Sequence, residues 1–160
     1  APRTPYVATA SVADLSDLER KVRYAMGLRG ARYIHIHGPC PLGWGSASCD
    51  TIRLARLACE TGLFPVFEAE RGEVTSVAKI RHRVPVVEYL KLQKRFAHLF
   101  TGAGHPEMLA RIQADVVVSQ EMFHSGDCVS VPSQYRAGFV CETWSMSDPT
   151  VAQTVLGPGW

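Results

Sequence analysis

Hydrophobic and polar positions in the first part of the chain follow the periods of strands and helices in turn. Residues 6–11 have the pattern of a short buried strand, and residues 33–37 (Tyr-Ile-His-Ile-His) that of a second one. Between them, apolar residues recur at three- and four-residue steps from Asp14 to Met26, which predicts a helix whose apolar stripe packs on a sheet. Ser16, with Glu19 three residues later, forms a capping-box pattern at its start.

A second helix and a pair of strands follow. Residues 50–60 are largely apolar and end at Gly62, as expected of a mostly buried helix. Residues 64–69 and 74–80 have the pattern of two strands, and the polar turn between them predicts a hairpin. This alternation of strands and helices favours an α/β fold, with helices packed on the faces of a sheet.

Helical patterns continue in the second half of the chain. Pro85 begins a predicted helix that reaches about Leu99, and Pro106 begins a shorter one that reaches about Val118. The apolar stripe of the first of these consists of Tyr89, Leu92, Phe96 and Leu99. No sustained period is found over residues 119–160, where Ser, Gly, Pro and Thr accumulate, so an irregular tail is expected there.

Composition excludes several classes of protein. The 160 residues are 46% hydrophobic and 20% charged, which excludes a disordered chain and fits one domain or part of a larger one. Apolar runs such as Val116–Val118 are far shorter than the roughly 20 residues of a membrane-spanning helix, so no membrane segment is expected. A net charge of +2 is too small to favour nucleic acid as a partner.

The sequence contains five cysteines, an odd number, at irregular spacing: Cys40, Cys49, Cys59, Cys128 and Cys141. This pattern argues against a disulfide framework and for a reducing, cytoplasmic environment, in which thiols serve as core residues, metal ligands or reactive groups. Cys59, on the mostly buried helix, is expected to be a core residue. Because the chain opens at Ala1 and not at Met, we expect it to be a fragment.

The sharpest local feature is residues 38–45, Gly-Pro-Cys-Pro-Leu-Gly-Trp-Gly, in which Cys40 lies between two prolines at the carboxyl end of a predicted strand. Prolines fix φ and glycines permit tight turns, so the backbone around this sulfur should be stiff. From these residues alone, Cys40 is a structural cysteine, a metal ligand or a nucleophile. A thiol redox protein that uses Cys49 as the resolving residue is a further alternative.

Two other groups could carry chemistry. His35 and His37 share one face of a strand, either as a pair of metal ligands or as polar contacts on a half-buried strand. Residues 79–95 contain one acid, Glu88, and a basic set that could meet an acidic partner or form a solvated face. This set is Lys79, Arg81, Arg83, Lys91, Lys94 and Arg95.

Four stretches, taken together, resemble the β subunit of pyruvate:ferredoxin oxidoreductase and its 2-oxoacid relatives. They are Pro-Tyr-Val-Ala-Thr-Ala-Ser (5–11), Tyr-Ile-His-Ile-His followed by Pro-Cys-Pro-Leu-Gly-Trp (33–44), Thr-Gly-Leu-Phe-Pro (61–65) and Pro-Val-Val-Glu-Tyr-Leu with Gln-Lys-Arg-Phe (85–96). The resemblance covers Pro5 to Val118. It implies part of a thiamine-diphosphate-binding fold, a parallel sheet flanked by helices, over residues 1–64, then a helical carboxyl-terminal extension over 65–118 and a tail of unassigned role over 119–160.

The resemblance also implies the chemistry. Members of this family decarboxylate a 2-oxo acid oxidatively to acyl-CoA and pass the electrons through a [4Fe-4S] cluster to ferredoxin. Cys40 matches the cluster cysteine that is remote in sequence from the other three, while the motif for Mg²⁺ and the diphosphate lies outside these residues. We therefore assign Cys40 as a metal ligand, no residue to thiamine diphosphate, and no catalytic residue, and we expect a chain that is inactive alone.

The implied partners are the other subunits of the complex, ferredoxin, coenzyme A and a 2-oxo acid. The Pro-Cys-Pro-x-Gly-Trp pattern favours pyruvate, and the basic region from Lys79 to Arg95 is a candidate docking face. Because the first half of the family's active site is absent, a non-catalytic remnant that only packs against a partner remains the main alternative.

Overall fold

A computed structural model of the chain describes residues 4–102 and 104–124. In chain order the elements are β1 (Tyr6–Ser11), α1 (Leu15–Gly27), β2 (Arg32–His37), α2 (Pro41–Trp44), the 3₁₀ helix η1 (Ser48–Asp50), α3 (Thr51–Thr61), β3 (Phe67–Glu70), β4 (Glu73–Val77), α4 (Val86–Leu90), the 3₁₀ helix η2 (Lys94–Leu99) and α5 (Pro106–His124). Most of the predicted tail, with Cys128 and Cys141, lies outside the described residues.

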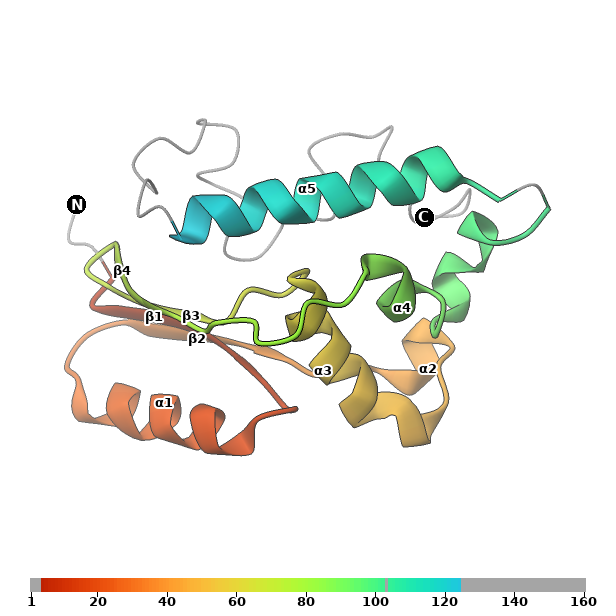
Figure 1. The fold of residues 1–160 in the computed structure, drawn as a ribbon. Helices are drawn as coiled ribbons and strands as arrows, with labels where there is room; N and C mark the ends of the chain where they lie inside the picture. Colours follow the sequence, from red (N-terminus) through yellow and green to blue (C-terminus); the bar gives the residue numbers. More distant parts are fainter. Residues whose placement is uncertain (1–3, 103, 125–160) are drawn as a thin grey trace.

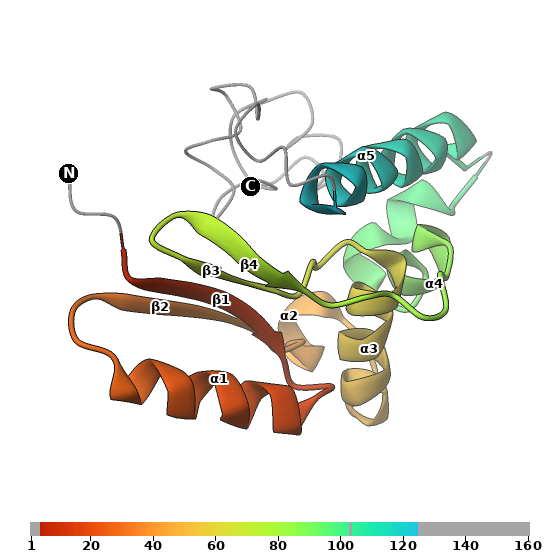
Figure 2. The same cartoon turned by 60° about the vertical axis from the view of Figure 1, so that its left-hand side comes forward.

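The sheet has the order β2-β1-β3-β4. Strands β1 and β2 are parallel, with Tyr6 opposite Arg32, whereas β3 runs antiparallel to both β1 and β4. The α/β class is thereby confirmed, in a mixed sheet whose parallel pairing joins β1 to β2. Helix α1 covers one face of the sheet, and α5 runs on the opposite side (Figures 1 and 2).

Helix α1 begins one residue later than predicted and has a different cap. The Asp14 carboxylate accepts a hydrogen bond from the Asp17 backbone N–H at 3.0 Å, so Asp14 is the N-cap. The predicted capping box at Ser16 is wrong, because Ser16 already lies in the first helical turn. The face toward the sheet buries Lys21 and Ala25, while Leu15 and Met26, both in the apolar stripe, are exposed.

The predicted hairpin is present, with shorter strands than expected. Arg71 and Gly72 both have positive φ, at 51° and 88°, as a two-residue type I′ turn requires. Before β3, the Thr9 hydroxyl donates to the Pro65 carbonyl at 2.7 Å and accepts from the Phe67 N–H at 2.9 Å. These two hydrogen bonds of the Thr9 side chain replace backbone hydrogen bonds between the strands at Pro65. Strand β3 therefore starts at Phe67.

The helix predicted over residues 85–99 is divided into α4 and η2, so that part of the prediction is wrong. Gln93 is extended, only 1% exposed, and its side-chain amide donates to the Tyr89 carbonyl at 2.8 Å, which ends the helix. Of its apolar stripe, Tyr89, Phe96 and Leu99 are nevertheless buried, and Leu92 is partly buried. The largest core cluster consists of Leu54, Leu57, Ala58, Val86, Tyr89, Leu90, Phe96, Leu99, Ile112 and Val116.

Helix α5 extends to His124, six residues beyond the predicted end at Val118. Its buried residues Ile112 and Val116 join the core with α3 and α4. Within the described ranges, no helix is both long enough and apolar enough to cross a membrane.

Candidate functional site

Cys40 lies where β2 has ended and the short helix α2 begins. It occupies the N-cap position of α2, and its backbone carbonyl accepts a hydrogen bond from the Trp44 N–H at 3.0 Å. The side chain is exposed. Its sulfur lies over Gly43, where an added Cβ would be 3.5 Å from Sγ, and the neighbouring Leu42 is 96% exposed. An accessible thiol thus lies on a closely wound turn at the carboxyl end of a parallel strand.

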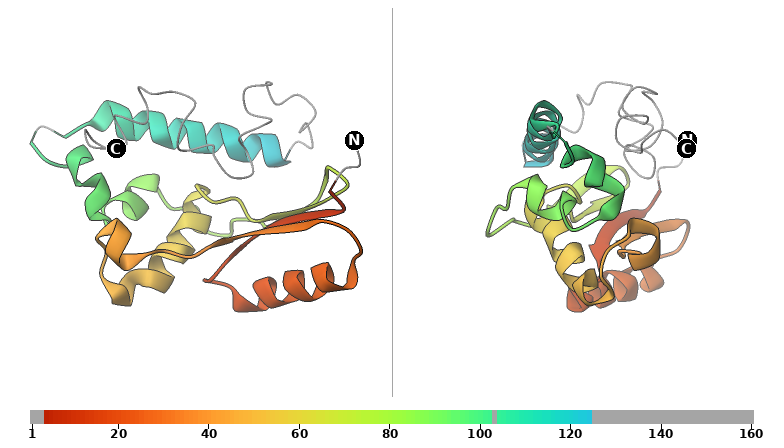
Figure 3. Two further views of the ribbon diagram at one scale, coloured as in Figure 1. Left: turned by 180° about the vertical axis from the view of Figure 1, so that it is seen from behind. Right: turned by 90° about the vertical axis from the view of Figure 1, so that its right-hand side faces the viewer.

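The far end of this turn is held by the segment that opens η2. The Arg95 guanidinium lies over the Trp44 ring, 4.0 Å from its centroid, and the Arg95 Nε–H donates to the Gln93 side-chain oxygen at 2.9 Å. Gly45 has φ of 63°, and a Cβ there would lie 2.7 Å from the Lys94 Cβ. In Figure 3, the turn that contains α2 and the segment that contains η2 lie side by side.

The two histidines of β2 pack among aromatic rings. The His37 ring centroid is 4.9 Å from that of Phe64 and 5.8 Å from that of Trp44, and the His35 and Phe64 centroids are 5.4 Å apart. The His37 Nδ1 is buried without a hydrogen-bond partner in the described part of the chain. Burial, then the charges of His35 and Arg95, lower the pKa of His37 to about 4. At neutral pH, His37 is therefore an uncharged aromatic side chain that packs against Phe64 and Trp44.

The alternative that His35 and His37 form a pair of metal ligands gains no support from this arrangement. Across residues 4–102 and 104–124, no three His, Cys, Asp or Glu side chains gather in a way that could hold a metal ion. Cys40 and Cys49 are exposed, and neither they nor Cys59 form a disulfide. Cys59 is only half-buried and borders a cavity, so it lies at the edge of the core that was predicted for it, and burial raises the pKa of its thiol. Of these three cysteines, Cys40 alone lies on the turn after β2, whereas Cys49 lies in η1 and Cys59 in α3.

The basic region from Lys79 to Arg95 does not form one uniform face. Lys79, Arg81 and Arg83 are exposed, and none of them is paired with an acid in the described residues. By contrast, Lys91 pairs with Glu88 at 2.6 Å, and Arg95 is turned onto Trp44. Lys94 is exposed, with its side chain beside Gly45 of the Cys40 turn. The candidate docking face is therefore taken as Lys79, Arg81 and Arg83, in the segment that follows β4.

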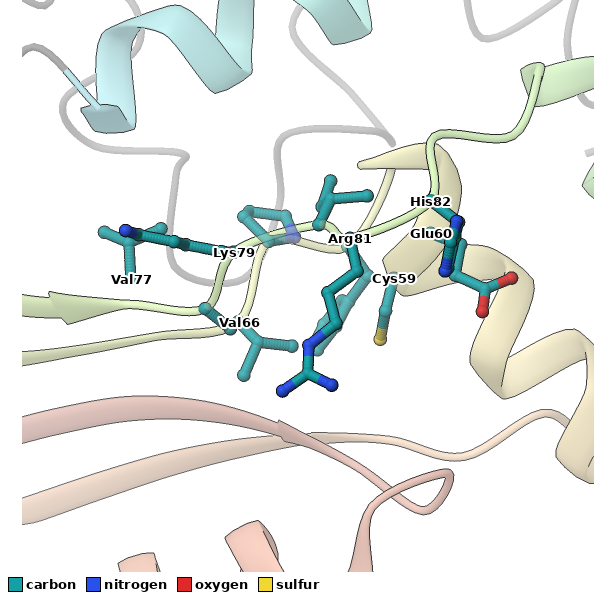
Figure 4. Close-up of a pocket in the computed structure, with 11 residues that line it drawn as sticks. Cys59, Glu60, Val66, Val77, Lys79, Arg81 and His82 are labelled. Carbon is teal, nitrogen blue, oxygen red and sulfur yellow. The ribbon is translucent and has the colours of Figure 1, made fainter.

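That segment also borders a shallow cavity of about 280 Å³, which the sequence did not predict (Figure 4). The cavity lies between the end of α3 and the two segments at the open end of the β3–β4 hairpin. Its floor is mainly apolar, with Phe64, Val66 and Ile80 among its lining residues, and Lys79 and Arg81 border it. Glu60 also lines the cavity, so charged groups of both signs border its apolar surface.

Comparison with known proteins finds sequences that are similar to most of this chain. Subunit PorB of pyruvate synthase from Methanosarcina barkeri is 49% identical over 111 residues, which cover 69% of this chain and 38% of that protein. PorB from Methanothermobacter thermautotrophicus is 45% identical over 119 residues, covering 74% of this chain and 40% of that protein. Over about seven tenths of its length, this chain is similar to subunit PorB of pyruvate synthases.

The chain is also similar to a subunit of an enzyme that is named for another substrate. Subunit VorB of ketoisovalerate oxidoreductase from Pyrococcus abyssi is 42% identical over 101 residues, which cover 62% of this chain and 32% of that protein. The chain thus spans between about a third and two fifths of the length of these relatives. No protein-family model matches the chain.

Proposed function

We propose that this chain is part of the β subunit of a 2-oxoacid:ferredoxin oxidoreductase, with pyruvate as the substrate. The observation that carries the proposal is the 49% identity to a pyruvate synthase subunit over 69% of the chain. The order of elements supports it, because the resemblance motifs fall on β1, on β2 with the Cys40 turn, at the end of α3 and on α4 with η2. The predicted division of the chain into three parts, with boundaries at residues 64 and 118, stays a prediction.

In this proposal, Cys40 supplies one thiolate to a [4Fe-4S] cluster. The exposed side chain and the stiff turn between two prolines suit a ligand whose sulfur must point in one direction. The other three ligands, and the residues that hold Mg²⁺ and thiamine diphosphate, belong to parts of the subunit outside the described residues. When bound, thiamine diphosphate supplies the electron sink for decarboxylation, and the cluster carries single electrons.

The proposed partners are the other subunits of the complex, coenzyme A and ferredoxin. Lys79, Arg81 and Arg83 are exposed and unpaired within the described ranges, so this segment is the proposed docking face for ferredoxin. Replacing all three with Gln should slow electron transfer to ferredoxin and weaken its dependence on salt. Lys91→Gln, on the same half of the chain but paired with Glu88, is the matched control.

The experiment uses the complete purified complex that contains this chain. Reduction of ferredoxin is measured with coenzyme A and either pyruvate or 3-methyl-2-oxobutanoate, in the native complex and in the variants Cys40→Ser and Cys49→Ser. We expect pyruvate to be preferred and Cys40→Ser to abolish the reaction, with Cys49→Ser close to native. A preference for the branched substrate would move the protein to the ketoisovalerate branch, and full activity of Cys40→Ser would remove the assigned role.

The two alternatives give different results in the same preparation. A non-catalytic packing remnant predicts a complex without 2-oxoacid-dependent activity and without iron. A thiol redox protein predicts that an oxidant links Cys40 to Cys49, both of which are exposed. Mass spectrometry of the oxidised protein after alkylation tests this link, and its absence excludes the thiol mechanism.

A further inference from the structure

We propose that Arg95 is a positioning residue, which fixes the Cys40 turn through Trp44 and raises the reduction potential of the cluster that Cys40 binds. This inference rests on the proposed function, since it requires a cluster at Cys40. It concerns a residue that is far from Cys40 in the sequence and comes from the helical extension.

The first step is the contact between the two segments. The Arg95 guanidinium lies over Trp44, with its central carbon 4.0 Å from the ring centroid. Trp44 is the last residue of α2, and its N–H donates to the Cys40 carbonyl. The position of Trp44 is therefore linked to that of Cys40 through a single hydrogen-bonded turn of backbone.

The second step is that Arg95 is itself held in place. Its Nε–H donates to the side-chain oxygen of Gln93, and Gln93 in turn donates to the Tyr89 carbonyl. Gln93 is only 1% exposed, so its hydrogen bond to Tyr89 is shielded from water, while the hydrogen bond from Arg95 is partly buried. The guanidinium is thus positioned before any ligand binds, which is the condition for a side chain to orient another group.

The third step concerns charge. Arginine remains protonated in proteins, and no carboxylate in the described ranges pairs with Arg95. Its polar partners are the neutral Gln93 and Tyr89, and its aromatic partners are Trp44 and Phe96. His37, whose ring centroid is 5.8 Å from that of Trp44, is neutral at pH 7. An uncompensated cation near a cluster stabilises the reduced form, which carries one more negative charge, and so raises the potential.

The test compares Arg95→Gln and Arg95→Lys in the complete complex. Both variants lose the flat guanidinium, but the lysine keeps the charge. A redox titration followed by electron paramagnetic resonance measures the cluster potential, and the rate of iron loss to a chelator measures how firmly the turn is held. Lys91→Gln removes a cation from the same segment away from Trp44 and is the matched control.

We expect both Arg95 variants to lose iron faster than the native complex. Arg95→Gln should also lower the cluster potential, whereas Arg95→Lys should restore most of it, and the Lys91 control should match the native protein in both measurements. An unchanged potential in Arg95→Gln, or an unchanged rate of iron loss in both Arg95 variants, would overturn the inference. A native complex without a Cys40-dependent cluster would instead contradict the proposed function, so the two failures are distinguishable.

Discussion

The ammonium group of Lys21 lies 2.8 Å from the backbone carbonyl oxygen of Thr9 and 2.5 Å from the carboxylate of Asp17. The Lys21 side chain is only 2% exposed, because it lies on the face of α1 that packs against the sheet. Asp17 also pairs with Arg20 at 2.8 Å, and Arg20 reaches Glu68 on β3 at 2.6 Å. A network of charges, in addition to apolar packing, therefore joins α1 to the sheet.

This network predicts unequal costs for its two central residues. Asp17→Asn leaves a buried ammonium without its counter-ion and should destabilise the protein by about 3 kcal/mol. Lys21→Met leaves a partly exposed carboxylate that Arg20 still pairs, and should cost less than about 1.5 kcal/mol. Urea denaturation of both variants measures the difference. Equal costs would show that the ion pair is not what stabilises this contact.

The same residue shows why α1 could be located from the sequence but its packing face could not. Apolar spacing predicted the helix to within a residue at each end, because the period of a helix depends on local sequence. The stripe included Leu15 and Met26, which are exposed, and omitted Lys21, which is buried. A buried lysine depends on a carbonyl from another strand, and this contact has no signature in the periodicity.

His37 makes stability depend on pH. The pKa of His37 in the folded protein is about 4, below its ordinary value of 6.5, so the unfolded chain takes up the proton first as pH falls. Stability from this residue is present above pH 6.5 and is lost as pH decreases from 6.5 to about 4. His37→Phe keeps an aromatic ring against Trp44 and Phe64 and should flatten this part of the profile.

Chemical denaturation at several pH values between 4 and 7 measures the profile in the native protein and the variant. If His37→Phe keeps the native slope over this window, the pH dependence comes from other groups.

Gly45 fixes the end of the Cys40 turn. Its φ of 63° lies in the left-handed region, where an alanine costs roughly 1–2 kcal/mol. An added Cβ would also lie 2.7 Å from the Lys94 Cβ, so η2 would have to move. Gly45→Ala should therefore lower the free energy of unfolding by more than the strain alone, as measured in urea. Gly43→Ala, in the same turn and with only an ordinary contact at 3.5 Å, should change it by less than about 1 kcal/mol.

The candidate site divides into a part that the sequence predicts and a part that it does not. The Cys40 turn was found because its prolines, glycines and cysteine are contiguous, and its place after β2 follows from the strand pattern. The contact of Trp44 with Arg95 was missed because it joins segments that are distant in the sequence. The break of the predicted 85–99 helix at Gln93, which makes this contact possible, depends on a buried side-chain hydrogen bond.

The proposal that Cys40 binds a cluster is tested most directly by the iron content of the complete complex. Iron and acid-labile sulfide per complex, with the electron paramagnetic resonance spectrum of the reduced protein, are compared among native, Cys40→Ser and Cys49→Ser preparations. We predict that Cys40→Ser loses the equivalent of one [4Fe-4S] cluster and its signal, while Cys49→Ser retains both. A Cys40→Ser complex with native iron, sulfide and spectrum would contradict the claim.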